Sequence, residues 1–254
     1  APEIMETHLK SVPAEYANLH NRYSRQGARV IALATKRILP ESLSDVKGIP
    51  RADVESDLEF AGFAIFACPL KWDSAPALRM LRDSSHHLIM ITGDHALTAC
   101  HVANKVHITS RKVLILHSDE ERDEQQWQWS STDKKIVKKF DSVSPESLGE
   151  EYDLCISGSA LTMLMSKDLL RSYLQYIQVY ARTSPDQKQQ IVNAFRDAGQ
   201  GTLMVGDGTN DVGALKQAHI GVALMSGNPT QPPRRSRKSG STGKKIKTGK
   251  SDRS

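Results

Sequence analysis

The sequence predicts an α/β fold built on a doubly wound parallel sheet. Between residues 87 and 224, short apolar runs alternate with stretches of helical periodicity. Strands that alternate with helices of about 10–15 residues are typical of parallel βαβ units. A second observation points the same way, because three of the apolar runs end in polar turns. In doubly wound sheets, functional side chains gather at the carboxyl ends of the strands.

The first third of the chain has elements that precede this alternation. In chain order they are a helix at 14–25, a strand at 28–39, a loop-rich stretch at 40–57, a strand at 58–70 and a helix at 73–84. Gly27 fits the C-terminal stop of the first helix. Pro40 and Pro69 end the two strands, because proline donates no backbone hydrogen bond to a ladder.

The alternating part supplies the remaining elements. They are a strand at 87–94, a helix at 95–106, strands at 112–116 and 152–158, one or two helices within 159–176, a strand at 177–182, a helix at 184–199, a strand at 202–208, a helix at 210–218 and a strand at 220–224. Ser184 followed by Pro185 is a strong helix start, since serine caps the first turn and proline is tolerated at its first position.

Two segments depart from this pattern. Residues 117–150 are charged and carry Trp127 and Trp129, which predicts a surface insertion, such as a small hairpin, with a structural role. Residues 226–254 hold nine Lys/Arg, one acid and almost no apolar side chains, which predicts a disordered basic linker. Proximity to anionic lipid is the second interpretation of this tail. The lack of interleaved aromatic residues argues against nucleic acid as its partner.

Composition sets further limits. The chain of 254 residues is 39% hydrophobic, which is enough for a packed core. The mean hydropathy is −0.44, and no apolar run approaches the length of about 20 residues that a membrane-spanning helix needs. No secretory signal is visible at the start.

Polar residues follow three of the predicted strands. In chain order they are Thr92, Gly93 and Asp94; Arg182 and Thr183, with Lys188 on the helix that follows; and Gly206, Asp207, Gly208, Asn210 and Asp211. Each turn alone is commonplace, and a single lysine on a helix is usually solvated. Three such turns in this order, each after a strand, indicate one shared site.

This set of side chains suits phosphoryl transfer. A hydroxyl and backbone N–H groups can hold phosphate oxygens, and a lysine can neutralise the charge that develops on them. Mg²⁺ takes oxygen ligands and needs only one or two carboxylates besides the phosphate. Glycine at 206 and 208 would let the backbone approach metal and phosphate closely. A divalent cation would also explain why carboxylates are tolerated at the end of a buried strand.

A covalent nucleophile is missing from this set. In this architecture it should be an aspartate at a strand end, followed by small or hydroxyl residues. The strand at 58–70 ends in Cys68-Pro69, and both Asp57 and Asp153 precede their strands. The sequence therefore contains the assisting groups of a phosphoryl-transfer reaction without its central residue.

Three motifs carry a resemblance to a known family. "GDGTNDVGAL" at 206–215 resembles the hinge motif of P-type ATPases, which belong to the haloacid-dehalogenase superfamily with its Rossmann-like sheet. "ITGDHALTACHVA" resembles their second phosphorylation-domain motif, and "YARTSPDQKQQIV" resembles the segment with their invariant lysine. "FACPLK" and "GTNDVGALK" make the match closest to the fifth subfamily, A branch, of the endoplasmic reticulum.

The resemblance implies a role for each matching residue. It makes Lys188, Thr92, Gly93 and Asp94 the catalytic set, with Lys188 stabilising phosphate charge and Asp94 holding the loop. Asp207 and Asp211 become the Mg²⁺ ligands. The residues implied to bind ATP and phosphate are Arg29, Arg182, Gly208 and Asn210. His95 departs from the family, where asparagine is usual, and this change should alter only the start of a helix.

The resemblance also implies a division of the chain and a larger parent. Residues 1–56 would be the end of a nucleotide-binding domain and a hinge, residues 57–225 the phosphorylation domain, and 226–254 the linker. The phosphorylated Asp-Lys-Thr-Gly-Thr segment, the actuator domain and the membrane helices do not occur in this sequence. The implied parent resides in the endoplasmic reticulum membrane, with this segment facing the cytosol. It would move transmembrane segments of proteins, or cations.

Two other functions stay open on the sequence. A soluble haloacid-dehalogenase-type phosphatase would use the same motifs, but it requires the strand-end nucleophile that is not found. A non-catalytic binding module could engage anionic membranes or nucleic acid through the basic tail, and its binding would then depend on salt.

Overall fold

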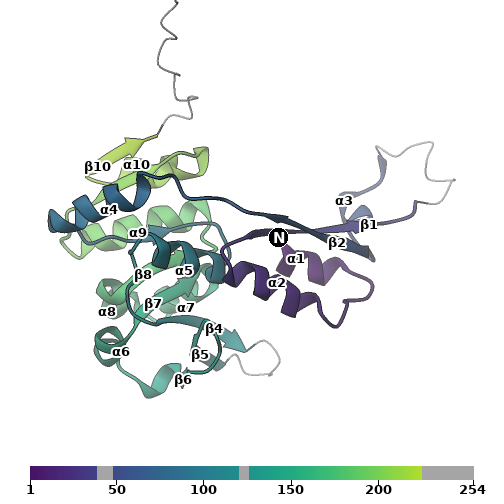
Figure 1. The fold of residues 1–254 in the computed structure, drawn as a ribbon, viewed down its shortest axis with the longest axis horizontal. Helices are drawn as coiled ribbons and strands as arrows, with labels where there is room; N and C mark the ends of the chain where they lie inside the picture. Colours follow the sequence, from purple (N-terminus) through teal and green to yellow (C-terminus); the bar gives the residue numbers. More distant parts are fainter. Residues whose placement is uncertain (39–47, 120–125, 225–254) are drawn as a thin grey trace, which may run out of the picture.

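The computed structural model describes residues 1–38, 48–119 and 126–224 (Figure 1). The predicted disordered linker at 226–254 lies outside the described residues, as do parts of the loop at 40–57 and of the insertion at 117–150. The predicted α/β class is confirmed. No described helix combines the length and the apolar character that crossing a bilayer requires.

A six-stranded sheet forms the centre of the molecule. Its order is β3-β8-β7-β4-β5-β6, parallel from β3 to β4 and antiparallel from β4 to β6. The strands are β3 (Met90–Ile91), β4 (Val113–Asp119), β5 (Gln126–Ser131), β6 (Val137–Lys139), β7 (Asp153–Ser157) and β8 (Ile177–Ala181). The parallel part follows the predicted βαβ order, so the carboxyl ends of β3, β7 and β8 lie at one edge.

Both faces of the parallel strands are buried, as a parallel sheet requires. Alternate residues point to opposite faces. Leu114, Leu154 and Ile156 join a core covered by helices, whereas Ile115 and Cys155 face α5 (Ala96–Lys105). The helices that cover the first face are α6 (Pro145–Glu151), α7 (Gly158–Ser166), α8 (Leu170–Tyr173) and α9 (Pro185–Asp197), with the 3₁₀ turns η2 (Phe140–Ser142) and η3 (Leu174–Tyr176).

The last two strands stand outside this sheet. Strand β9 (Leu203–Gly206) pairs in parallel with β10 (Ile220–Ala223), and the pair makes a sheet of its own. The 3₁₀ turn η4 (Thr209–Asp211) and α10 (Val212–Gln217) connect them. The predicted strands are therefore present, but their membership of one continuous sheet is not observed. The side chains of Leu203, Val205 and Ile220 are 44%, 45% and 58% exposed, so this pair lacks the cover that parallel strands usually have.

An N-terminal unit precedes the main sheet. It contains α1 (Pro2–His8), α2 (Tyr16–Arg25), β1 (Arg29–Thr35), α3 (Arg51–Val54) and β2 (Glu59–Phe66); α4 (Ser74–Asp83) follows it. Strands β1 and β2 form an antiparallel ribbon that extends away from the main sheet, with α3 at its far end (Figure 1). Tyr16 packs against Phe60 and Phe63 and joins α2 to this ribbon. Gly27 has φ of +81°, the left-handed conformation expected of a helix stop.

The segment at 117–150 is part of the core as well as of the surface. Strands β5 and β6 extend the main sheet through antiparallel pairing with β4. The side chain of Trp129 is fully buried, and its ring lies 5.9 Å from that of Tyr173. The expected hairpin is present, and it contributes a large apolar side chain to the packing beneath α8.

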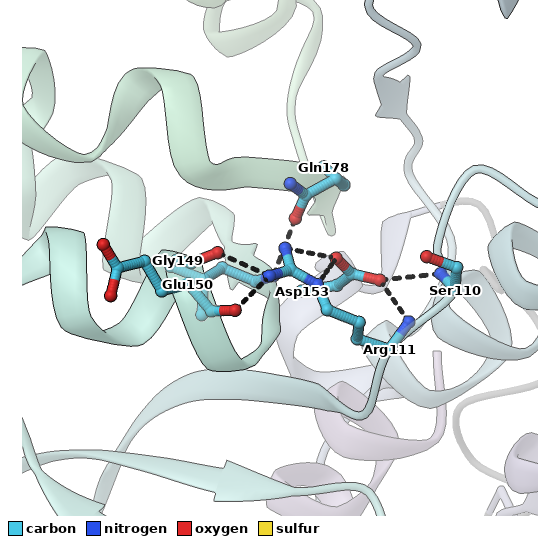
Figure 2. Close-up of polar contacts among 7 residues, drawn as sticks. Ser110, Arg111, Gly149, Glu150, Asp153 and Gln178 are labelled. Carbon is cyan, nitrogen blue, oxygen red and sulfur yellow. Dashed lines mark hydrogen bonds and ion pairs between the residues drawn. The ribbon is translucent and has the colours of Figure 1, made fainter.

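An ion pair between Arg111 and Asp153 fixes the start of β7 (Figure 2). The buried Asp153 carboxylate accepts hydrogen bonds from the backbone N–H groups of Ser110 and Arg111, at 2.7 and 2.8 Å. It also accepts from Nε and Nη2 of Arg111, at 3.0 and 2.9 Å. The guanidinium donates further to the carbonyls of Gly149 and Glu150, which close α6. Asp153 therefore has a structural role at the amino end of its strand.

We expect Asp153→Ala to lower the free energy of unfolding by about 3 kcal/mol, because it leaves two backbone donors and a guanidinium without their acceptor. Urea unfolding of the 254-residue chain at pH 7 measures this. Asp141→Ala is the matched control, since Asp141 is exposed, and should change the value by less than about 0.5 kcal/mol. Equal effects of the two substitutions would contradict the assignment.

Candidate functional site

The loop after β3 is held by the end of β8. The N–H of Thr92 donates to the carbonyl of Tyr180 at 2.8 Å, and the N–H of Thr183 donates back to the carbonyl of Thr92 at 3.1 Å. The Thr183 hydroxyl reaches the same carbonyl at 3.0 Å, and the N–H of Asp94 donates to the Thr92 hydroxyl at 3.1 Å. Two predicted strand ends thus form one hydrogen-bonded unit.

Two arginines lie beside this loop. Arg29 of β1 places its Nη2 3.5 Å from the Asp94 carboxylate. Arg182 donates its N–H to the carbonyl of Asp94 at 3.0 Å and has φ of +52°, which is uncommon outside glycine. Both arginines, with Gly93 and Asp94, line a cavity of about 530 Å³ between the N-terminal unit and the main sheet.

Lys188 and Asp211 form a buried ion pair. Lys188 lies in the first turn of α9, where Ser184 and Gln187 form a reciprocal capping box. Its Nζ lies 2.7 Å from Oδ1 of Asp211, and both side chains are buried. Burial alone would raise the pKa of Asp211, but hydrogen bonds from Lys188 and the N–H of Gly208 outweigh it, and the pKa is lowered.

The turn after β9 has no room for a larger residue at Gly206, whereas at Gly208 the tip of the Asn210 side chain is the obstacle. A Cβ at Gly206 would lie 2.6 Å from Cβ of Asp211, and one at Gly208 would collide with Oδ1 of Asn210. The carboxylate of Asp211 accepts from the N–H of Gly208 at 3.2 Å, which closes the turn. Asp207 and Asn210 are exposed at its tip. The turn therefore buries one carboxylate and presents the other to solvent.

The predicted site residues fall into two groups. Arg29, Thr92, Gly93, Asp94 and Arg182 surround the loop after β3, whereas Lys188, Asp207, Gly208, Asn210 and Asp211 surround the turn after β9. Among these ten residues, no hydrogen bond or ion pair joins one group to the other. The two groups are linked through the chain from Arg182 to Lys188, at the start of α9.

The donor set of the turn after β9 fits Mg²⁺. Asp207 offers an exposed carboxylate and Asn210 an amide oxygen, both hard oxygen ligands. Asp211 is already compensated by Lys188, so it would support the site rather than contribute a free charge. One carboxylate with an amide oxygen is the modest protein contribution that Mg²⁺ needs when a phosphate supplies the remaining ligands.

A third cluster was not anticipated from the sequence. Oε1 of Glu3 lies 3.2 Å from Nε2 of His95 and 3.7 Å from Nε2 of His20, and Oε2 lies 2.6 Å from Nη2 of Arg182. Glu3 and Arg182 are 179 positions apart, so no local pattern connects them. The motif around His95 was the one available signal, and it pointed only to a helix start.

Comparisons with known proteins place these motifs in context. No family model matches the chain. The probable manganese-transporting ATPase PDR2 of Arabidopsis thaliana is 48% identical over 248 residues, which cover 97% of this chain and 21% of that protein. The endoplasmic reticulum transmembrane helix translocase of Saccharomyces cerevisiae is 43% identical, with 89% of this chain and 19% of that protein covered. The probable cation-transporting ATPase 13A5 of Mus musculus is 34% identical, with 88% and 20% covered.

The chain belongs to the P-type ATPases of the fifth subfamily. The chain spans about one fifth of the length of the curated relatives that it matches. The predicted relationship is confirmed, and the α/β architecture agrees with the haloacid-dehalogenase type of sheet in phosphorylation domains.

The buried Lys188–Asp211 pair gives a stability prediction. Asp211→Ala leaves the Lys188 ammonium buried without a partner, so the free energy of unfolding should fall by about 3 kcal/mol at pH 7. The pKa of Asp211 is lowered, so its contribution is complete above about pH 4 and is lost as the pH falls through the folded-state pKa. Urea unfolding at several pH values tests this. Asp197→Ala, at the exposed end of α9, is the control, and an equal loss in both variants would refute the role of the pair.

His95 gives a pH-dependent prediction. Burial lowers its pKa to about 4, against the opposing effect of the Glu3 carboxylate. Between about pH 6.5 and that value the unfolded chain binds a proton that the folded chain does not, so stability should fall as the pH falls, by up to about 3 kcal/mol. Asparagine keeps a capping oxygen for the N–H of Leu97, so His95→Asn should flatten this dependence without removing the cap.

The control for this prediction is His107→Asn. His107 is exposed, and its φ of +62° is one that asparagine tolerates. Urea unfolding between pH 4.5 and 7 should show the wild-type slope in His107→Asn and a shallower slope in His95→Asn. The same slope in all three proteins would show that His95 is not the titrating group.

Proposed function

We propose that this chain is the phosphorylation-domain segment of an ATP-driven membrane transporter, together with the end of its nucleotide-binding domain. Residues 57–225 would form the phosphorylation domain, and residues 1–56 the remnant of the nucleotide-binding domain and a hinge. Membership of the P-type ATPases and the match to one fifth of much longer relatives support this proposal.

The observation that carries the proposal is the turn after β9 with its buried Lys188–Asp211 pair. In our proposal Asp207 holds Mg²⁺ with the support of Asn210 and Asp211, and the glycine at 208 lets the metal and phosphate approach the backbone. Bound Mg²⁺ would neutralise charge on the phosphate oxygens. Lys188, in the first turn of α9, is held beside this turn by its ion pair with Asp211 and would stabilise the charge that develops on the transferred phosphoryl group.

The loop after β3 would hold the phosphoryl group from the other side. Thr92 offers a hydroxyl, Gly93 an exposed N–H, and Asp94 keeps the loop closed through its bond to the Thr92 hydroxyl. Arg29 and Arg182 line the neighbouring cavity and are suited to the phosphates of ATP. These roles are supported by the hydrogen bonds that fix the loop to the end of β8.

The nucleophile would come from another part of the parent. Among the described residues, β3 ends the main sheet and β9 pairs with β10 alone, so each has one edge without a partner strand. We propose that a strand of the parent pairs between them and carries the phosphorylated aspartate, in the Asp-Lys-Thr-Gly-Thr segment that the family resemblance implies. Such a strand would pair with the open edge of β9 and bring the two groups of site residues to one phosphate.

The names of the relatives support a proposal for the membrane and the cargo. Three relatives at 43–47% identity are named endoplasmic reticulum transmembrane helix translocases, and others are named for manganese or cation transport. We propose that the parent lies in the endoplasmic reticulum membrane with this segment facing the cytosol. Its cargo would be a transmembrane protein segment or a cation, selected by membrane helices outside this chain.

Phosphorylation of the intact parent tests the proposal. Incubated with Mg²⁺ and radiolabelled ATP, the parent should acquire an acid-stable, hydroxylamine-sensitive label, whereas the 254-residue chain alone should acquire none. Asp207→Asn in the parent should lower the rate of labelling by about 100-fold or more, because it removes a preorganised charge from the site.

Asp197→Asn in the parent is the matched control for Asp207→Asn and should label at the wild-type rate, since Asp197 lies on the exposed end of α9. A hydroxylamine-sensitive label on the isolated chain would overturn the proposal that the nucleophile lies elsewhere. Normal labelling of Asp207→Asn would overturn the proposed metal site.

A further inference from the structure

Glu3 lies where three separate elements meet. It belongs to α1 of the N-terminal unit, whereas Arg182 follows β8 and His95 caps α5. One carboxylate oxygen accepts a 2.6 Å hydrogen bond from Nη2 of Arg182, and the other lies 3.2 Å from Nε2 of His95. Arg182 donates its backbone N–H to the carbonyl of Asp94, and His95 directly follows Asp94 in the chain, so both adjoin the Thr92–Asp94 loop. Glu3 therefore contacts both supports of the loop at the same time.

The surroundings of Glu3 favour its charged form. Burial would raise the pKa of Glu3, but the hydrogen bond from Arg182 and the positive charges nearby outweigh it and lower the pKa. The groups that face this carboxylate are Arg182, His95 and His20, with Arg25 of α2 lying close to His95. The ring of His20 packs edge-on against that of His95, with centroids 4.8 Å apart.

Metal coordination is the first alternative for this cluster, because the ligand atoms of Glu3, His20 and His95 lie within 4.8 Å of one another. Two observations argue against it. Nδ1 of His95 accepts the N–H of Leu97, so the neutral ring carries its proton on Nε2 and has no lone pair to offer there. The guanidinium of Arg182 already neutralises the carboxylate and would repel a second cation. The geometry favours a bridge in which Glu3 accepts a hydrogen bond from Arg182 and lies against the ring of His95.

The conformation of Arg182 shows that the loop needs such a bridge. Its φ of +52° is strained for a non-glycine residue, and strain of this kind persists only when surrounding contacts over-determine it. The contacts are the Arg182 N–H to the Asp94 carbonyl and the guanidinium to Glu3. The next residue, Thr183, donates to the carbonyl of Thr92. Releasing the side chain of Arg182 would therefore loosen the backbone of residues 182 and 183, whose N–H groups hold the Thr92–Asp94 loop.

We propose that Glu3 is a positioning residue that fixes the Thr92–Asp94 loop through Arg182 and His95, and so joins the nucleotide-binding part of the chain to its phosphate site. The functional meaning of this bridge rests on the proposed function, although its structural effect does not. Other contacts cross the same boundary, among them Arg29 to Asp94, Thr98 to the carbonyl of Ala28, Arg25 to the carbonyl of Thr132, and the ring of His20 against that of His95. None of these four involves Arg182.

Amide hydrogen exchange of the 254-residue chain tests this inference. The N–H groups of Arg182 and Thr183 report directly on loop closure, because they donate to the carbonyls of Asp94 and Thr92. Glu3→Gln keeps the size of the side chain and removes its charge, so protection at these two amides should fall by about tenfold or more, as expected for a lost charge-assisted hydrogen bond. Protection within β7 should stay at its wild-type value.

The matched control is Glu6→Gln, an acid of the same helix that makes no side-chain hydrogen bond or ion pair among the described residues. It should leave all amides at wild-type protection. Unchanged protection of Arg182 and Thr183 in Glu3→Gln would overturn the inference, and so would an equal loss throughout the chain or in both variants. The aspartate of Glu3→Asp keeps the charge, but its side chain is too short to reach both Arg182 and His95. Protection of the two amides should therefore lie between that of the wild type and that of Glu3→Gln.

The consequence for the reaction has its own readout. In the intact parent, Glu3→Gln should lower the maximal rate of aspartyl-phosphate formation more than it raises the KM for ATP, because the loop that it positions acts on the phosphoryl group. A change in KM alone would overturn this assignment. If the parent forms no aspartyl-phosphate at all, the proposed function fails, while the exchange experiment still decides whether Glu3 holds the loop.

Discussion

The buried ion pair between Lys188 and Asp211 is the interaction on which the candidate site depends. Because β9 and β10 lie outside the main sheet, α9 and α10 connect them to it. The pair locks the turn after β9 onto the start of α9, and Arg196 adds a hydrogen bond to the carbonyl of Gln217 at the far end. A buried ion pair contributes little net stability compared with apolar packing, but removing one of its two partners is costly because the other charge stays buried. The Lys188–Asp211 pair therefore serves mainly to fix the positions of Lys188 and of the turn that carries Asp207.

The separation of β9 and β10 from the main sheet leaves their apolar side chains exposed. Parallel strands are normally buried on both faces, yet Val205, Ile220 and Leu224 are 45%, 58% and 53% exposed. At the other side of the break, β3 has only two paired residues and ends the main sheet. The loop after β3 and the turn after β9 therefore belong to two separate sheets, and in our proposal one strand of the parent between them would complete both the sheet and the site.

Local signals predicted much of the fold, and long-range contacts were beyond them. The capping box at Ser184 and the left-handed Gly27 are decided by residues a few positions apart, and both were predicted as helix boundaries. The burial of Trp129 and the separation of β9 from the main sheet depend on tertiary packing, which periodicity does not contain. The motifs located ten candidate residues. They missed Glu3, because its contact with Arg182 joins residues 179 positions apart.

The most direct test of the central claim is the size of the native polypeptide that contains this sequence. The polypeptides of the membrane fraction and of the soluble fraction would each be separated by mass. The peptides of each band would then be identified by mass spectrometry. We predict peptides of this chain in a membrane-bound polypeptide about five times its length, together with an Asp-Lys-Thr-Gly-Thr segment, as the one-fifth coverage of its relatives implies. A soluble product near 28.1 kDa with no further sequence would contradict the assignment to an ATP-driven transporter.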